Sequence, residues 1–165
     1  MGNLSKLNKR GAAMKIQSTR FGEMNIPEEH ILRFDQGIPG FPDENEFAFL
    51  PYEAGSPFGF LQSIRDADLT FLIVEPFSFL PEYTFELNDE WSKELGVSTE
   101  NPPQIFNIVS IKEPLQQSTV NLLAPVIVNW KDCKAKQIIL EKVEYTTKHL
   151  LFPDGLPNQT NQGGK

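Results

Sequence analysis

The sequence predicts an all-β protein, a small antiparallel β-barrel-like domain with one short helix. Short apolar segments, several with the two-residue alternation typical of strands, recur along the chain. Turn-forming Gly, Pro, Asn and Asp residues separate these segments at short intervals. Helical signals are confined to one stretch near residue 90. Many short strands at this spacing favour a closed or nearly closed antiparallel sheet.

The expected strands follow one another through most of the chain. They are residues 14–20, 31–34, 46–52, 58–64, 70–74, 83–87, 104–111, 120–123, 126–130 and 136–140. Within residues 46–52, the two-residue period places Phe47 and Phe49 on one face. Between residues 120–123 and 126–130, Ala124-Pro125 predicts a bulge or a kink at a sheet edge, because proline has no backbone donor.

One helix is expected, over residues 89–95. Asn88 provides an N-cap, Asp89 and Glu90 place acids in the first turn, and Gly96 provides a stop. So short a helix can only be an accessory to the sheet. We expect it to cover a sheet edge or to plug one end of the barrel.

The 165 residues predict one domain with two tails. Residues 1–13 are polar and basic and are interpreted as a leader or an added extension, residues 14–152 as the folded unit, and residues 153–165 as a flexible C-terminal tail. The start lacks the apolar core of a secretion signal, and no apolar run approaches the ~20 residues that span a bilayer. The single cysteine, Cys133, excludes an internal disulfide framework. These features predict a cytoplasmic protein without membrane contact.

Charge is distributed unevenly along the chain, whose net charge is −7. Residues 21–110 hold 17 acidic side chains against three basic ones, whereas residues 111–165 hold seven lysines against five acids. The first 20 residues add five basic side chains. A largely acidic domain repels nucleic acid and attracts basic partners. An acidic surface that only keeps the protein soluble is the alternative.

The sequence is poor in catalytic signals. It has no phosphate-cradling glycine loop, no nucleophile elbow and no paired-cysteine or zinc motif. His30 and His149 are far apart in sequence, and Cys133 lies in a lysine-rich turn without a base. We therefore expect no enzyme, with no catalytic residue, cofactor or metal. The alternative is a small-molecule or carbohydrate-handling β-barrel, such as a carboxylate-pair hydrolase, which needs a cleft of roughly 300 Å³ with two converging carboxylates.

The segment Gly37-Ile38-Pro39-Gly40-Phe41 is both rigid and apolar. Proline fixes φ, and glycine supplies φ values that other residues avoid. Ile38 and Phe41 favour burial. The loop is therefore a shaped corner of the fold, a contact for a partner, or both.

Four segments together resemble the bacterial flagellar assembly factor W family. They are residues 34–41, 58–76, 121–129 and 135–140, and the similarity spans residues 14–151. The resemblance implies a small antiparallel barrel without enzymatic activity that binds flagellin in the cytoplasm. It also implies binding to the dimeric RNA-binding protein carbon storage regulator A, whose repression of flagellin translation is thereby antagonised. Flagellin translation is then coupled to flagellar assembly.

The resemblance supplies no agreed set of contact residues. Asp66, Asp68 and Glu75 flank the strand expected at residues 70–74 in the acidic half, so we predict that they form an electrostatic face for a basic partner. A solvated turn is the alternative for Asp66 and Asp68. We expect the protein to be a monomer when free and to make no direct contact with nucleic acid.

Overall fold

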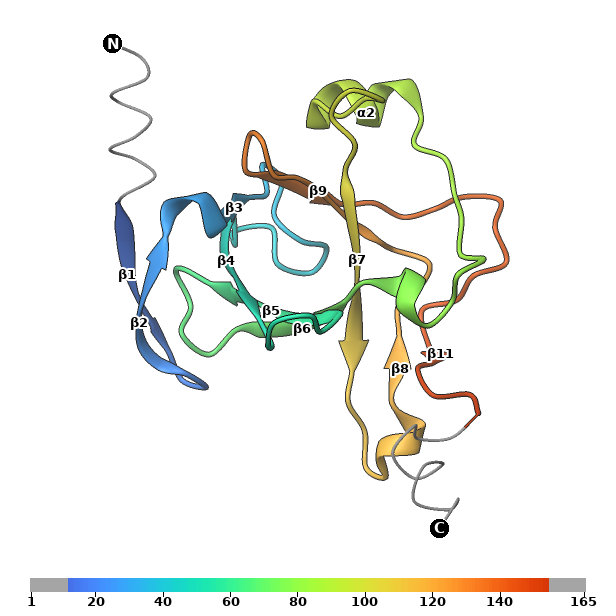
Figure 1. Ribbon diagram of the computed structural model, residues 1–165, viewed down its shortest axis with the longest axis horizontal. Coiled ribbons are helices and arrows are strands. Elements are labelled where there is room, and N and C mark those ends of the chain that lie inside the picture. The colour runs from blue at the N-terminus through green and yellow to red at the C-terminus, as the bar shows by residue number, and fades with distance from the viewer. Residues whose placement is uncertain (1–11, 155–165) are drawn as a thin grey trace.

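The computed structural model describes residues 12–154 and confirms the all-β fold class (Figure 1). Its strands are β1 Ala13–Ser18, β2 Gly22–Pro27, β3 Ile31–Arg33, β4 Glu46–Pro51, β5 Phe58–Ser63, β6 Thr70–Val74, β7 Gln104–Ser110, β8 Thr119–Val120, β9 Val126–Asn129, β10 Lys134–Gln137 and β11 His149–Leu150. The α-helix is α2 Asp89–Leu95, and the 3-10 turns are η1 Glu28–His30, η2 Pro76–Ser78 and η3 Leu115–Gln117. The predicted leader and tail lie almost entirely outside the described residues.

Seven strands close into a barrel. Strands β3 to β7 form an antiparallel meander, β7 pairs with β9, and β9 pairs with β10. The ring is completed by β10 and β3, which run parallel and share a single residue pair, Lys134 with Arg33. This last seam is therefore the weakest part of the barrel wall.

The predicted kink at Ala124-Pro125 is confirmed by the register along β7. Strand β8 pairs Val120 with Val109, whereas β9 pairs Val126 with Phe106. The chain thus advances six residues from Val120 to Val126 while its partner β7 advances only three, from Val109 to Phe106. The segment between β8 and β9 therefore bulges out of the ladder. This offset lets the end of β7 leave the barrel and pair with β8, which in turn pairs with β11.

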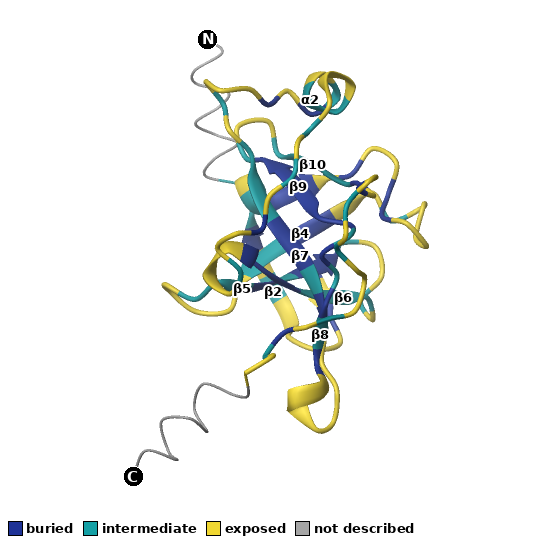
Figure 2. Cartoon of the chain, turned by 90° about the vertical axis from the view of Figure 1, so that its right-hand side faces the viewer, coloured by how far each residue is buried: buried dark blue, intermediate teal, exposed yellow. Residues whose placement is uncertain are grey.

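The barrel interior is filled by alternate residues of its strands. It contains Leu32, Phe34, Ile38, Phe47, Leu61, Ile73, Phe106, Val126, Val128 and Ala135, all buried, with Phe49 packed against them. Phe47 and Phe49 thus share a face as predicted. Figure 2 shows this buried centre enclosed by exposed loops. Each fully buried Phe or Leu contributes about 1.5–3 kcal/mol, so the interior contributes substantially to the stability.

Two elements cover the outside of the barrel. The β1–β2 hairpin packs Ile16 and Ile26 on Ala48 of β4. Helix α2 packs Leu95 against Ile127 of β9 and Ile138, so it covers the wall rather than plugging an end. Its predicted caps are confirmed: Asn88 Oδ1 accepts a hydrogen bond from the Trp91 N–H at 2.7 Å, and Gly96 is left-handed. No helix within residues 12–154 is long and apolar enough to cross a membrane.

The strand expected at residues 83–87 is wrong, because this segment has no backbone ladder. Its backbone is hydrogen-bonded in other ways: the Tyr83 N–H donates to the Leu80 carbonyl, and the Tyr145 hydroxyl bonds the backbone of Thr84. The Tyr83 hydroxyl donates to the Leu122 carbonyl at 2.6 Å, and the Tyr145 hydroxyl accepts from the Thr84 N–H at 3.0 Å. Tyr83 is buried against Tyr145 and Val109 as part of an outer cover. The apolar alternation in residues 83–87 therefore results from side-chain packing and not from strand pairing. Strands β2 and β11 were not predicted, and β8 ends at Val120 rather than at residue 123.

Candidate partner-binding end of the barrel

The loop from Gly37 to Phe41 closes one end of the barrel. Ile38 and Phe41 pair across the tight turn Pro39-Gly40, with the Phe41 N–H donating to the Ile38 carbonyl at 2.6 Å. Ile38 is buried in the barrel interior. Gly37 has φ +69°, and a Cβ there would lie 2.5 Å from the Phe41 carbonyl oxygen. No other residue fits this position without moving the loop, so Gly37 fixes the course of the loop backbone and Ile38 anchors it in the interior.

The other half of the loop faces outward. Pro39 and Gly40 are exposed, and Phe41 keeps 39% of its surface exposed while its ring meets Phe71 of β6 edge-on at 5.6 Å. A rigid turn thus presents apolar surface to solvent at this end. Such a preorganised apolar surface suits a partner contact, because little conformational entropy is lost when it binds.

Asp66 and Asp68 lie in the exposed turn between β5 and β6, at the same end of the barrel. Asp66 Oδ1 accepts from the Asp68 N–H at 2.9 Å, and the Thr19 hydroxyl at the tip of the β1–β2 hairpin donates to Asp68. Both carboxylates are therefore held by local contacts while remaining in solvent.

Glu75 does not join them, although the prediction grouped the three. It follows β6, whereas Asp66 and Asp68 precede it, so the length of that strand separates them. Glu75 is also half-buried and accepts a hydrogen bond from Gln104 Nε2 at 2.9 Å, and Gln104 Oε1 accepts from Trp130 Nε1 at 2.6 Å. Residues that precede and follow a strand lie at its opposite ends. The three acids therefore do not form one surface, although they are close in sequence.

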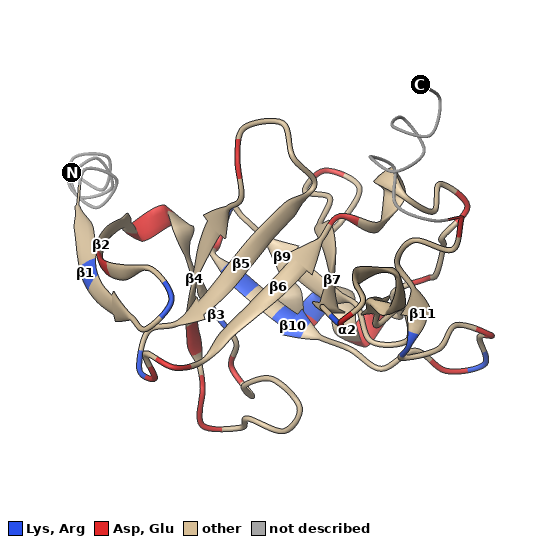
Figure 3. Ribbon diagram, turned by 90° about the horizontal axis from the view of Figure 1, so that it is seen from below, with Lys and Arg blue, Asp and Glu red and all other residues tan. Residues whose placement is uncertain are grey.

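Further acids gather at the loop end, and the prediction did not include them. Because Arg33 pairs with Glu46 and Phe47 with Ser63, the end of β3, the start of β4 and the end of β5 lie side by side. The resulting set, here called the acidic end, is Asp35, Asp43, Glu44, Glu46, Asp66 and Asp68. In Figure 3 the loop between β3 and β4 projects from the lower edge of the molecule and carries several of these acids.

Basic side chains are fewer at the acidic end. Arg33 forms an ion pair with Asp35 at 2.9 Å, Arg65 donates to the Asp43 carbonyl at 3.1 Å, and Arg20 lies beside Asp68. Lys134, Lys136 and Glu94 also line the hollow beside Asp35 and the turn. Seven carboxylates therefore lie among five basic side chains, so the surface around the exposed apolar turn carries a small net negative charge. An apolar centre with a charged rim is the usual anatomy of a protein interface. The separate sequence segments could have been linked only by knowing the strand register.

The structure offers little for catalysis. Within residues 12–154, no three His, Cys, Asp or Glu side chains lie close enough to hold a metal ion. A hollow of about 220 Å³ contains Asp35 and Glu94, but each carboxylate is occupied by an ion pair, with Arg33 and with Lys136. A second hollow of about 300 Å³ is lined by apolar and amide side chains without a carboxylate. Burial and the nearby Glu29 carboxylate raise the pKa of the Cys133 thiol, which disfavours the reactive thiolate. The carboxylate-pair hydrolase is therefore not favoured.

Comparison with known proteins identifies the family. A family model described as FliW protein matches residues 15–151. The chain belongs to the FliW family. A flagellar assembly factor FliW from Desulfitobacterium hafniense is 53% identical over 152 residues, which cover 92% of this chain and all of that protein. The FliW of Bacillus subtilis is 43% identical over 136 residues, covering 82% and 95% of the two chains.

The fold agrees with a solved FliW structure. A crystal structure of a flagellar assembly factor FliW superposes with a TM-score of 0.79 at 37% sequence identity, covering 87% of this chain and all of that one. The resemblance seen in the four sequence segments is thereby confirmed, and the protein is a flagellar assembly factor by family.

Proposed function

We propose that the protein is a non-enzymatic, cytoplasmic binding protein with two alternative protein partners, flagellin and carbon storage regulator A. Binding the regulator relieves its repression of flagellin translation, and flagellin that occupies the protein returns the regulator to its RNA. Flagellin synthesis is thereby coupled to flagellar assembly. Membership of the FliW family supports this role.

The observation that carries the proposal is the acidic end around the exposed Pro39 and Phe41 turn. A regulator that grips RNA phosphates carries a basic surface. Docking an acidic domain on or near that surface opposes RNA both sterically and through its field. The same charge argues against direct contact between this protein and nucleic acid.

The two partners place different demands on the surface. The basic regulator is matched by Asp66, Asp68 and the other carboxylates of the acidic end, which raise the association rate and are screened by salt. Flagellin is expected to depend more on apolar contacts than on the carboxylates of the acidic end. The protein offers such surface next to the same loop, in the hollow lined by Ile38, Pro39 and Phe71.

Titration calorimetry with the purified protein, monomeric flagellin and the regulator tests the proposal. We expect each partner to bind alone, the regulator to lose its RNA when the protein is added, and excess flagellin to restore RNA binding. A regulator that keeps its RNA at saturating concentrations of the protein would contradict the proposed antagonism.

A further inference from the structure

The barrel wall leaves one strand edge open. Strand β10 shares only the pair Lys134 with Arg33 with its neighbour β3, and the chain of β3 then turns away into the Gly37–Phe41 loop. The rest of β10 and the residues that follow it are paired only on the β9 side. A closed barrel normally leaves no such edge, because an unpaired row of N–H and C=O groups can pair with another chain.

The hydrogen bonds on the paired side show which groups remain free. The Ile138 N–H donates to the Pro125 carbonyl at 3.0 Å, and the Leu140 N–H donates to the Leu123 carbonyl at 2.9 Å. Adjacent residues of an extended chain direct their backbone groups to opposite sides. Gln137 and Ile139 therefore present theirs to the open edge. Within residues 12–154, neither of these two N–H groups donates to a side chain or to backbone outside the strand ladders.

An apolar groove runs beside this open edge. It has a volume of about 300 Å³ and is lined by Ile38, Pro39, Phe71, Ile108, Asn121, Leu123, Ala124, Gln137, Ile139 and Thr147. Ile139 lies two residues beyond the end of β10 and keeps 56% of its surface exposed. On the other side of Pro39, the hollow of about 220 Å³ continues along Lys134 to Gln137. Free backbone groups beside an apolar groove suit an added strand, whose alternate side chains would enter the groove.

The charge near the edge decides between the two proposed partners. Residues 131–148 hold five lysines and three acids, in contrast to the acidic end. Lys148 is exposed and directly follows Thr147, which lines the groove. A basic regulator is therefore disfavoured here, whereas an acidic segment is attracted and a neutral segment meets no charge repulsion.

We propose that the edge from Gln137 to Ile139 binds an extended segment of flagellin by strand addition, with an apolar flagellin side chain in the groove beside Phe71 and Leu123. This inference rests on the proposed function, because that function supplies flagellin as the partner. It separates the flagellin site from the acidic end, while the Gly37–Phe41 loop borders both. Flagellin bound here is therefore placed to disturb the loop on which the regulator docks.

Amide hydrogen exchange of the isotopically labelled protein, measured by NMR with and without monomeric flagellin, tests the backbone pairing. In the free protein, the Ile138 and Leu140 amides should exchange slowly and the Gln137 and Ile139 amides quickly. Flagellin should slow exchange at Gln137 and Ile139 by at least about tenfold, because each gains a hydrogen bond. A helix lying in the groove would leave these two amides unprotected and would overturn the inference.

A pair of matched variants tests the side-chain contact. Ile139→Lys places a charge on the open edge and should weaken flagellin binding about tenfold or more. Ile111→Lys is the control, since Ile111 is exposed to a similar extent, 53% against 56%, but lies beyond the end of β7 and does not line the groove. If both variants bind flagellin as tightly as the original chain does, the inference is overturned but the proposed function is not. Absence of flagellin binding to the original chain would overturn the proposed function as well.

Discussion

Replacement of Gly37 is expected to lower the stability of the protein strongly. Its φ of +69° costs a residue with a side chain about 1–2 kcal/mol. In addition, a Cβ would lie 2.5 Å from the Phe41 oxygen and 2.7 Å from two backbone atoms of Pro42, contacts that only a backbone shift relieves. Overpacking of this kind costs about 1–3 kcal/mol. Gly37→Ala should therefore destabilise the protein by about 2–5 kcal/mol.

Gly40 is the matched control in the same loop. Its φ is +90°, but a Cβ there would have no neighbour within 4 Å. Gly40→Ala should therefore destabilise the protein only by the cost of the positive φ, about 1–2 kcal/mol. Urea denaturation of the two variants and the original chain, analysed at constant m value, measures both losses. A loss for Gly37→Ala no larger than the loss for Gly40→Ala would show that the close approach of the loop backbone has no energetic consequence.

Three other substitutions test particular contacts. Burial raises the pKa of Tyr83 to about 12, so the hydroxyl loses its proton at a lower pH in the unfolded chain than in the folded protein. The free energy of unfolding should therefore be constant below pH 9 and fall between pH 10 and 12, by at most about 1.4 kcal/mol per pH unit. Denaturation of Tyr83→Phe should lack this part of the pH dependence. At neutral pH the same variant should lose about 1–3 kcal/mol, because Tyr83 no longer donates to Leu122 or accepts from Asn107. Asn88→Ala should cost about 1 kcal/mol in thermal unfolding through the lost N-cap of α2, whereas an unchanged midpoint would show that the cap is dispensable. Glu75→Gln should leave the affinity for the regulator unchanged, since Glu75 lies at the far end of β6. A loss of affinity as large as that caused by Asp68→Asn would show that Glu75 is part of the interface.

Much of the fold could be predicted because local chemistry and tertiary structure agree. Strands β4 to β7 and β9 follow their alternating or β-branched patterns, and α2 follows its Asn88 and Gly96 caps. Residues 83–87 show the limit of such patterns: Tyr83 and Phe85 alternate as in a strand, but they alternate to pack on an outer cluster, and side-chain hydroxyls replace the ladder. The apolar alternation of β2 is short, only Met24 and Ile26 between Gly22 and Pro27, and is a weak strand signal.

The candidate site was only partly predictable. The motif at Gly37–Phe41 and the acids Asp66 and Asp68 were identified separately, and only the strand register shows that they share one end of the barrel. Glu75 was grouped with them by sequence proximity, which says nothing about which end of a strand a residue occupies. The open edge at Gln137 and Ile139 has no sequence signal, because it depends on the chain of β3 leaving the barrel wall after one residue pair.

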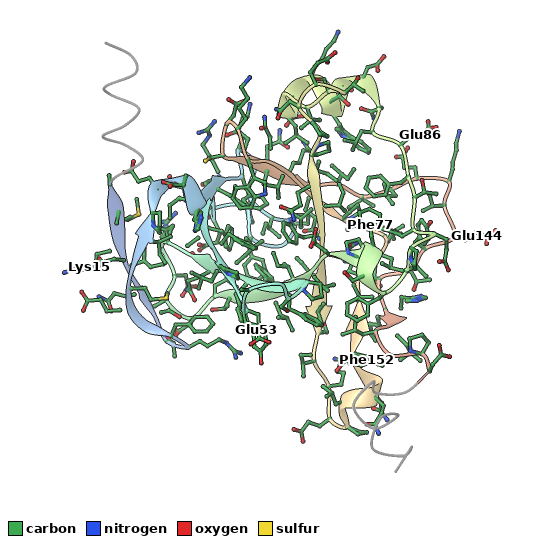
Figure 4. The ribbon with its side chains drawn as sticks, viewed as in Figure 1. Lys15, Glu53, Phe77, Glu86, Glu144 and Phe152 are labelled. Atoms are coloured by element: carbon green, nitrogen blue, oxygen red, sulfur yellow. The ribbon has the colours of Figure 1, made fainter. Side chains whose placement is uncertain are left out.

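Binding of the basic regulator at the acidic end is the basis of the proposed function. Its most direct test is the association rate of carbon storage regulator A with Asp66→Lys/Asp68→Lys, measured by stopped flow at several salt concentrations. The control, Glu82→Lys/Glu86→Lys, makes the same change in net charge at exposed acids outside the acidic end, and Figure 4 shows Glu86 on the side of the molecule away from the β1–β2 hairpin.

We expect the association rate of the original chain to fall steeply with salt while dissociation changes little. At low salt, the variant of the acidic end should associate about tenfold or more slowly, and the control should remain close to the original chain. Equal rates for the two variants, at low and high salt alike, would contradict the account and place the regulator elsewhere on the protein.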